Sequence, residues 1–172
     1  FLGFGTSNAT AIIGDCSVIL VDTLDSIIHG QDLKKALTKL TNKPVKTIIY
    51  THSHYDHLGG SGVFRDTVEE IIAFSPVKKN PAYYDAIQDA LNRRSLYQFG
   101  YSLTDEEAIT QGLGPREGKG GIGLPERSIL PATRIYADDI VERVIDGVKL
   151  TLIAAPGETD DQAYVWLEED KV

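Results

Sequence analysis

The feature that most constrains this chain is the segment from Thr51 to Gly60, where three histidines and an aspartate fall within six residues. The apolar run 47–50 comes directly before it, and two glycines end it. Imidazole nitrogen and carboxylate oxygen are the ligands that zinc and similar metals prefer. The segment therefore predicts a metal site at the end of a buried strand.

The spacing within this segment predicts two pairs of ligands. Side chains at i and i+2 of an extended backbone point to the same side, so His52 and His54 can converge on one ion. Asp56 and His57 follow where Gly59-Gly60 indicates a sharp turn, which redirects them toward a second ion. A loop of solvent-exposed histidines is the alternative, but three of the chain's four histidines lie here. His29, the fourth, is expected on ordinary surface.

The apolar pattern predicts the strands of a layered α/β fold. Residues 9–13 and 18–21 are apolar on either side of Gly14-Asp15, which predicts a β-hairpin that opens a sheet. Continuous apolar runs at 47–50 and 71–74 predict strands buried on both faces, as in the inner strands of such a fold.

Helices and a long loop are predicted between these strands. Apolar residues recur at i, i+3, i+4 and i+7 over 33–40, which predicts an amphipathic helix. Asn80-Pro81 predicts the start of a second helix that extends to about residue 98. The acidic residues 105–107 suggest a short helix. The glycine-rich stretch 111–127 predicts a long loop, interpreted either as a surface linker or as a wall over the metal site.

A second hairpin is predicted over residues 140–154, because Asp146-Gly147 favours a type I′ turn. Its second strand leads into Pro156-Gly157-Glu158. A last strand is predicted at 163–167.

The position of Glu158 predicts a third metal ligand. If the strand before each motif belongs to one sheet, Glu158 can meet His52 and His54, although more than one hundred residues separate them. Asp160 and Asp161 are rival donors, and a solvated acidic turn is their alternative role. Glu158 is preferred because of its position.

The motif His-x-His-x-Asp-His at 52–57, after a short apolar strand, resembles the signature of the metallo-β-lactamase superfamily. The segment 17–23 is similar to the family's strand that ends in Asp-Thr, and 155–159 is similar to its Pro-Gly-His-Thr turn. Glutamate stands here at the usual histidine position. The alkyl sulfatase branch also places a glutamate ligand after this Pro-Gly, and residues 50–60 match the first motif of that branch throughout. The glycine-rich stretch resembles the same branch more loosely.

This resemblance implies an αββα sandwich, of which residues 1–172 are expected to form one domain, truncated at both ends and covering roughly the N-terminal half. It implies Zn²⁺, with two ions per complete site, and a catalytic role for Asp56. The remaining ligands of the second ion are expected beyond Val172, so the isolated chain should bind that ion weakly and have little activity. The implied metal ligands in this chain are His52, His54, Asp56, His57 and Glu158.

The chemistry predicted for such a site is hydrolysis, because a dinuclear centre lowers the pKa of a bound water toward neutrality. The sequence holds no Gly-x-Ser-x-Gly elbow, phosphate-binding loop or dinucleotide fingerprint. The resemblance points to alkyl sulfate esters, whose oxygens would need donors. Arg116, Lys119 and Arg127 are candidates, each with solvated surface charge as its alternative role. A thioester, lactone or β-lactam hydrolase and a non-catalytic metal-binding fragment are the competing hypotheses.

Composition limits the classes of partner and the compartments that are expected for this chain. A net charge of −8 would repel a phosphate backbone, so a nucleic-acid partner is not expected. No apolar run approaches the roughly 20 residues that cross a bilayer, so the chain as given is expected to be soluble. The single Cys16 excludes an intrachain disulfide and leaves bacterial cytoplasm and periplasm both open. The expected partner is a small-molecule ester, and a homodimer of the full-length protein stays open.

Overall fold

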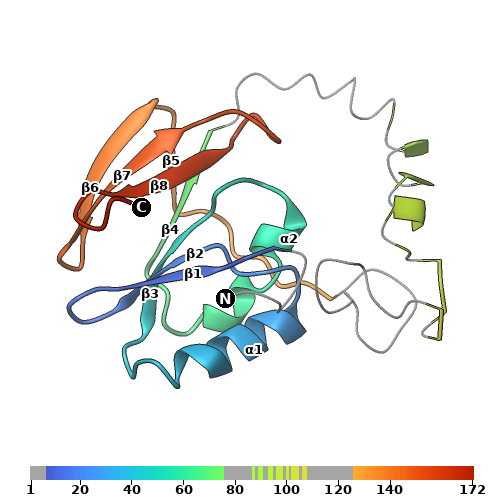
Figure 1. Cartoon of the computed structure of the whole chain (residues 1–172), viewed down its shortest axis with the longest axis horizontal. Helices are drawn as coiled ribbons and strands as arrows, with labels where there is room; N and C mark the ends of the chain where they lie inside the picture. The colour runs from blue at the N-terminus through green and yellow to red at the C-terminus, as the bar shows by residue number, and fades with distance from the viewer. Residues whose placement is uncertain are drawn as a thin grey trace.

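The fold consists of two β-sheets that pack face to face, with helices on the outer side of the first sheet (Figure 1). The computed structural model describes residues 7–75 and 126–172 and scattered positions from 87 to 107. Sheet A contains β1 (Thr10–Ile13), β2 (Val18–Val21), β3 (Val45–Ile49), β4 (Glu70–Phe74) and β5 (Arg134–Tyr136). Sheet B contains β6 (Ile140–Ile145), β7 (Val148–Ala154) and β8 (Ala163–Leu167). The helices are α1 (Ile27–Leu37), α2 (Tyr55–Leu58) and the 3₁₀-helix η1 (Ser61–Phe64).

Sheet A has the inner parallel strands that the apolar runs predict. β1 and β2 form the predicted antiparallel hairpin, and β2, β3, β4 and β5 pair in parallel, in that order. Alternate residues of the central strand face opposite layers: Ile48 packs toward the helices and Ile49 toward sheet B, and both are buried. The layered α/β prediction is confirmed. The short strand β5 has no clear apolar signal and was not predicted.

Helix α1 packs on sheet A but differs from its prediction at one end. Ser26 caps it by accepting the His29 amide at 3.3 Å, and Leu33 and Leu37 are buried on its inner face. The bonds from Lys39 to the Ala36 carbonyl and from Leu40 to the Leu37 carbonyl span three residues instead of four, so the chain tightens where the helix ends at Leu37. Leu40 is consequently 65% exposed, so its predicted place on the buried face is wrong.

The expectation that His29 is ordinary surface is also wrong. His29 is 4% exposed, and its Nδ1 lies 2.6 Å from Oδ1 of the fully buried Asp25. Asp25 precedes α1 and His29 lies in its first turn, where the Ile27 amide donates to the Glu126 carbonyl and Arg127 Nε donates to the Asp25 carbonyl. Tertiary packing, which local sequence does not display, decides the burial of this histidine.

Sheet B forms the predicted hairpin and last strand. Asp146 and Gly147 have φ angles of 47° and 82°, which is the left-handed backbone that a type I′ turn requires at both positions. The Asp146 carboxylate accepts bonds from the Ser17 amide at 2.6 Å and the Ser17 hydroxyl at 2.8 Å. The hairpin turn is thereby fixed to the turn between β1 and β2 in the other sheet.

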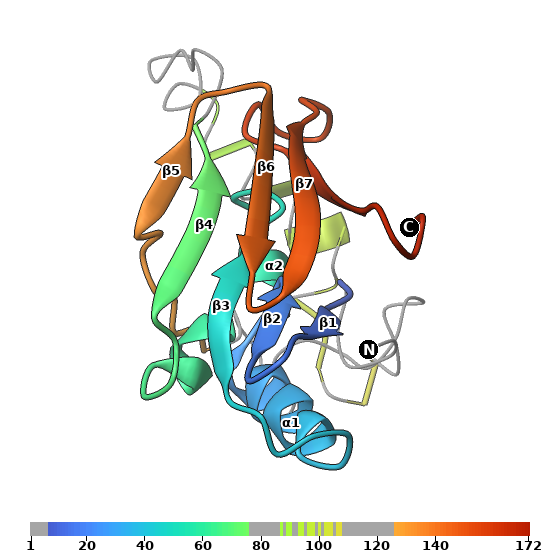
Figure 2. The same ribbon diagram turned by 90° about the vertical axis from the view of Figure 1, so that its left-hand side faces the viewer.

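The two strands that precede the ligand motifs lie in different sheets, whereas the prediction that the motifs meet assumed one shared sheet. β3 belongs to sheet A and β7 to sheet B, and Figure 2 shows sheet B in front of sheet A. The motifs still meet, because the sheets are joined at this end by the bond from the Ala163 amide to the Thr51 carbonyl at 2.8 Å. The face-to-face packing of the two sheets therefore brings the ligand motifs together, although their strands do not share a sheet.

Several predictions fall outside the described residues. The helix expected from about residue 81 to 98 is described only in part. Its described positions, from 87 to 98, have helical backbone. Of the short helix expected at 105–107, residues 106 and 107 are described and form a turn, not a helix. Most of the glycine-rich loop at 111–127 lies outside the described residues. Among the described helices, none has the length and apolar character that crossing a membrane requires.

A charged group at the far edge of the sandwich also joins the two sheets. Glu70 of β4 accepts from Arg134 of β5 at 2.5 Å and from Arg143 of β6 at 3.0 Å. Burial alone would raise the pKa of Glu70, but the bonds and charges of the two arginines outweigh it, and the pKa is lowered. Ionised Glu70 therefore stabilises the fold above its unfolded pKa, and this stability is lost as the pH falls through the lower folded pKa.

We predict that Glu70→Gln lowers the free energy of unfolding by about 1 kcal/mol at pH 7, because a neutral amide binds the guanidinium groups less well. The difference from the wild type should shrink below about pH 4. Urea denaturation followed by circular dichroism measures both. Glu69→Gln is the matched control, since the neighbouring Glu69–Lys46 pair is exposed and should contribute nothing measurable. Equal stability of Glu70→Gln and Glu69→Gln at pH 7 would contradict the prediction.

Candidate metal centre

The histidine-rich segment leaves the carboxyl end of β3 and turns into α2. His52 comes three residues after the strand and is 5% exposed, and His54 precedes α2 with extended backbone. Gly59 and Gly60 make the turn possible. A Cβ at Gly59 would lie 2.0 Å from the carbonyl oxygen of Asp25, and a Cβ at Gly60 would lie 2.3 Å from that of Thr23. The glycines therefore let the segment pack directly on the loop that follows β2.

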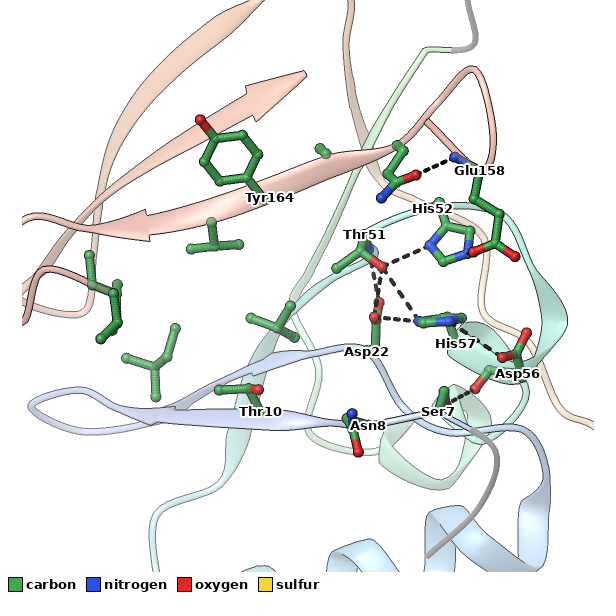
Figure 3. A pocket seen from close by; sticks show the side chains of 17 residues that line it. Ser7, Asn8, Thr10, Asp22, Thr51, His52, Asp56, His57, Glu158 and Tyr164 are labelled. Atoms are coloured by element: carbon green, nitrogen blue, oxygen red, sulfur yellow. Dashed lines mark hydrogen bonds and ion pairs between the residues drawn. The ribbon is translucent and has the colours of Figure 1, made fainter. Parts of the chain in front are cut away.

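His52, His54 and Glu158 converge as the sequence predicts (Figure 3). His52 Nε2 lies 3.7 Å from Glu158 Oε2, and His54 Nδ1 lies 3.3 Å from Glu158 Oε1. One nitrogen or oxygen atom from each of the three side chains lies within 4.8 Å of the other two. Donor atoms this close together can surround a single cation.

A metal ion fits this group for a specific reason. His52 Nε2 is buried and has no hydrogen-bond partner among the described residues. A buried polar atom left without a partner is unfavourable by about 1–3 kcal/mol, and such an atom needs an explanation. A cation between His52 and Glu158 would supply the missing partner, with two imidazoles and a carboxylate as its ligands.

Asp56 and His57 lie beside this group. His57 Nε2 is 3.4 Å from Asp56 Oδ2, and the rings of His52 and His57 have centroids 4.1 Å apart. The four predicted side chains of this segment thus gather in one place, and the structure also brings Glu158 to them. Their roles as ligands of one or two ions, and the catalytic role of Asp56, remain predictions.

The carboxylate of Asp22 orients His57 directly and His52 through Thr51. Its oxygens accept from the Thr51 amide at 2.8 Å, the Thr51 hydroxyl at 2.7 Å and His57 Nδ1 at 2.6 Å. Because the Thr51 hydroxyl donates to Asp22, it accepts from His52 Nδ1 at 3.0 Å. Both histidines then carry their proton on Nδ1, so Nε2 of each keeps its lone pair for a metal.

Electrostatics distinguish the two histidines. Burial lowers the pKa of His52, and the neighbouring His57 and His54 lower it further, so its ring is in the neutral form that binds metal. Burial also opposes protonation of His57, but the bond and charge of Asp22 and the charge of Asp56 outweigh it, and its pKa is raised. A proton therefore competes more strongly with metal at His57.

The turn that carries Glu158 separates it from its two rivals. Asp161 accepts from the Ser53 hydroxyl at 3.2 Å, which ties the acidic turn to the histidine segment. Among the described residues, neither Asp160 nor Asp161 joins a group of metal-ligating side chains, whereas Glu158 does. The geometry therefore favours Glu158 as the third ligand.

Of the three residues predicted to bind the substrate, the structure describes one. Arg116 and Lys119 lie outside the described residues. Arg127 stacks over the ring of Tyr55 with its Cζ 5.1 Å from the centroid, and its Nε donates to the Asp25 carbonyl at 3.2 Å. It lies beside the histidine segment but is not among the side chains that line the cleft next to it, so its role in binding sulfate remains a prediction.

Sequence reasoning missed the residues that support the ligands. Asp22 appeared only as part of an Asp-Thr strand end, and Thr51 and Gln162 received no role. The available signal was an acidic residue directly after an apolar strand, which becomes informative once β2 is known to pair with β3.

Comparison with known proteins places this geometry in a wider context. A sequence model described as the metallo-beta-lactamase superfamily matches residues 2–172. The chain is 33% identical to the alkyl/aryl-sulfatase BDS1 of Saccharomyces cerevisiae over 99% of its own length and 27% of that protein. It is 27% identical to a linear primary-alkylsulfatase of a Pseudomonas strain, over 90% of this chain and 30% of the relative.

Among solved structures, the sec-alkylsulfatase Pisa1 from Pseudomonas sp. superimposes with a TM-score of 0.75 at 20% identity. The match covers 97% of this chain and 27% of that structure. At this identity the likeness concerns the fold, and it confirms the predicted metallo-β-lactamase-like architecture. The chain thus spans less than a third of the length of these relatives.

We predict that Asp22→Asn weakens zinc binding by about 10- to 100-fold, the usual effect of losing a residue that orients a ligand. Asparagine tolerates the left-handed backbone at this position, φ 60°, but its NH₂ group cannot accept the bonds that the carboxylate accepts. Competition with a zinc chelator measures the affinity. Asp32→Asn on the exposed face of α1 is the control, and an Asp22→Asn affinity equal to that of this control would contradict the prediction.

Proposed function

The chain belongs to the metallo-β-lactamase superfamily, and from this premise we propose that it carries the metal site of a zinc-dependent hydrolase that acts on alkyl sulfate esters. The observation that carries the metal dependence is the convergence of His52, His54 and Glu158. Within the described part of the chain, the buried His52 Nε2 has no hydrogen-bond partner. The likeness to alkylsulfatases over nearly the whole chain supports the substrate class.

The residues divide into groups with different tasks. His52, His54 and Glu158 would hold the first ion, and Asp56 and His57 would contribute to a second. When bound, zinc supplies a water molecule with a pKa near neutrality. The side chains do the remaining work: Asp22 and Thr51 fix the histidine tautomers, and Asp56, 34% exposed at its side chain, would orient that water and accept its proton.

The position of Glu158 matters for the choice among hydrolases. Most members of the superfamily resemble one another in carrying histidine after Pro-Gly, whereas the alkyl sulfatase branch carries a glutamate ligand near this place. A carboxylate in place of an imidazole lowers the net positive charge of the loaded site. Because a sulfate ester is itself an anion, we infer that the site relies on further donors to bind it.

A substrate panel tests the proposal, with octyl sulfate, a thioester and a β-lactam offered to the zinc-loaded protein. We expect octyl sulfate to bind at least about tenfold more tightly than the other two. Any turnover should release inorganic sulfate from octyl sulfate, and it should be slow because this chain is expected to bind the second ion weakly. Calorimetry measures the affinities, and sulfate release measures the reaction.

The control is His52→Ala, which should lose zinc, affinity for octyl sulfate and any turnover together. Preferred binding or hydrolysis of the thioester or the β-lactam would contradict the sulfatase assignment. Zinc binding without affinity for any of the three compounds would instead identify a non-catalytic metal-binding module.

A further inference from the structure

A cleft of about 800 Å³ opens between the two sheets beside the proposed metal ligands. His52, Asp56, His57 and Glu158 line one end of it (Figure 3). Gln162 also lines the cleft, and its Oε1 lies 2.7 Å from the backbone nitrogen of Glu158. The acidic side chains there would repel an anionic substrate, so a donor in this cleft has a clear use. Gln162 is the candidate that the geometry singles out.

Several bonds fix the position of Gln162. Its Oε1 accepts from the Glu158 amide at 2.7 Å, its carbonyl accepts from the Ala155 amide at 2.8 Å, and its own amide donates to the Thr159 carbonyl at 3.3 Å. A Cβ at Gly157 would lie 2.8 Å from Oε1, so the glycine lets the side chain close over the turn. Gln162 thereby spans the turn that presents Glu158.

The bond from the Glu158 amide also fixes the orientation of the Gln162 side-chain amide. A backbone N–H can only be accepted by the carbonyl oxygen of glutamine, so Oε1 must face Glu158 and the NH₂ group must face away from it. That NH₂ group has no hydrogen-bond partner within residues 7–75 and 126–172, and its residue lines the cleft. Two donor hydrogens are left available to a bound molecule.

We propose that Gln162 is a substrate-binding residue, whose Nε2 donates to an oxygen of the sulfate group while its Oε1 holds Glu158 in place. The inference rests on the proposed function and adds to it a neutral donor for the anionic ester. A neutral amide suits this position, because it binds an oxyanion without forming an ion pair with Glu158 or Asp56. One side chain would thus couple the metal ligand to substrate recognition.

Two variants separate the two ends of the amide. Gln162→Glu keeps an oxygen for the Glu158 amide but replaces the donor with a negative charge, and Gln162→Leu removes both functions at similar volume. We expect Gln162→Glu to keep zinc affinity within about twofold of the wild type. Its dissociation constant for octyl sulfate should rise roughly 100-fold, because a hydrogen bond is lost and a like charge is added.

Gln162→Leu should weaken zinc about tenfold, as expected when a residue that supports a ligand is lost. It should also weaken octyl sulfate about tenfold when measured at saturating zinc. Chelator competition gives the zinc affinities, which do not depend on turnover, and calorimetry with octyl sulfate gives the second quantity. Gln31→Glu and Gln31→Leu on the exposed face of α1 are the matched controls and should change neither.

The outcomes distinguish this inference from the proposed function. If the wild type binds octyl sulfate and Gln162→Glu binds it equally well, the donor role is overturned while the function stands. If Gln162→Glu loses zinc as Gln162→Leu does, the assignment of Oε1 to Glu158 is overturned. If the zinc-loaded wild type does not bind octyl sulfate, the proposed function fails and this inference fails with it.

Discussion

The arrangement of the candidate metal centre depends on the buried carboxylate of Asp22. It lies at the end of β2, next to the end of β3, and accepts three hydrogen bonds from Thr51 and His57. A carboxyl group at 4% exposure needs such donors. The left-handed backbone of Asp22 is unfavourable by roughly 1–2 kcal/mol, and the same bonds offset it. One residue thereby joins a strand end, a loop and a helix, and it sets the tautomers of two histidines.

The second requirement is the packing of the two sheets. The histidines come from sheet A and Glu158 comes from the turn between two strands of sheet B, so the three-ligand group exists only while the sheets are packed together. The Ala163–Thr51 backbone bond and the Ser53–Asp161 side-chain bond hold this edge closed. A metal bound across the interface would stabilise the folded state over the unfolded one, because the unfolded chain has no preformed site.

Local patterns predicted the parts of the site that local geometry determines. The i, i+2 spacing predicted that His52 and His54 lie together, although residues 51–53 bend instead of continuing the strand. The Asp146-Gly147 turn fixed the hairpin that leads to Glu158. What escaped prediction depends on neighbours distant in sequence. The role of Asp22 requires knowing that β2 pairs with β3, and the burial of His29 requires knowing what covers α1. The role of Gln162 requires knowing the path of a turn, and β5 forms because a neighbouring strand pairs with a short polar segment.

The most direct test of this account is a crystal structure of the zinc-loaded protein, with anomalous diffraction recorded at the zinc absorption edge. The account predicts an ion bonded to His52 Nε2, His54 Nδ1 and a carboxylate oxygen of Glu158, at distances of about 2.0–2.2 Å. The His54–Glu158 contact of 3.3 Å would then be replaced by two bonds to the same ion. Zinc bound elsewhere, or bound by the histidines while Glu158 points into solvent, would contradict the central claim.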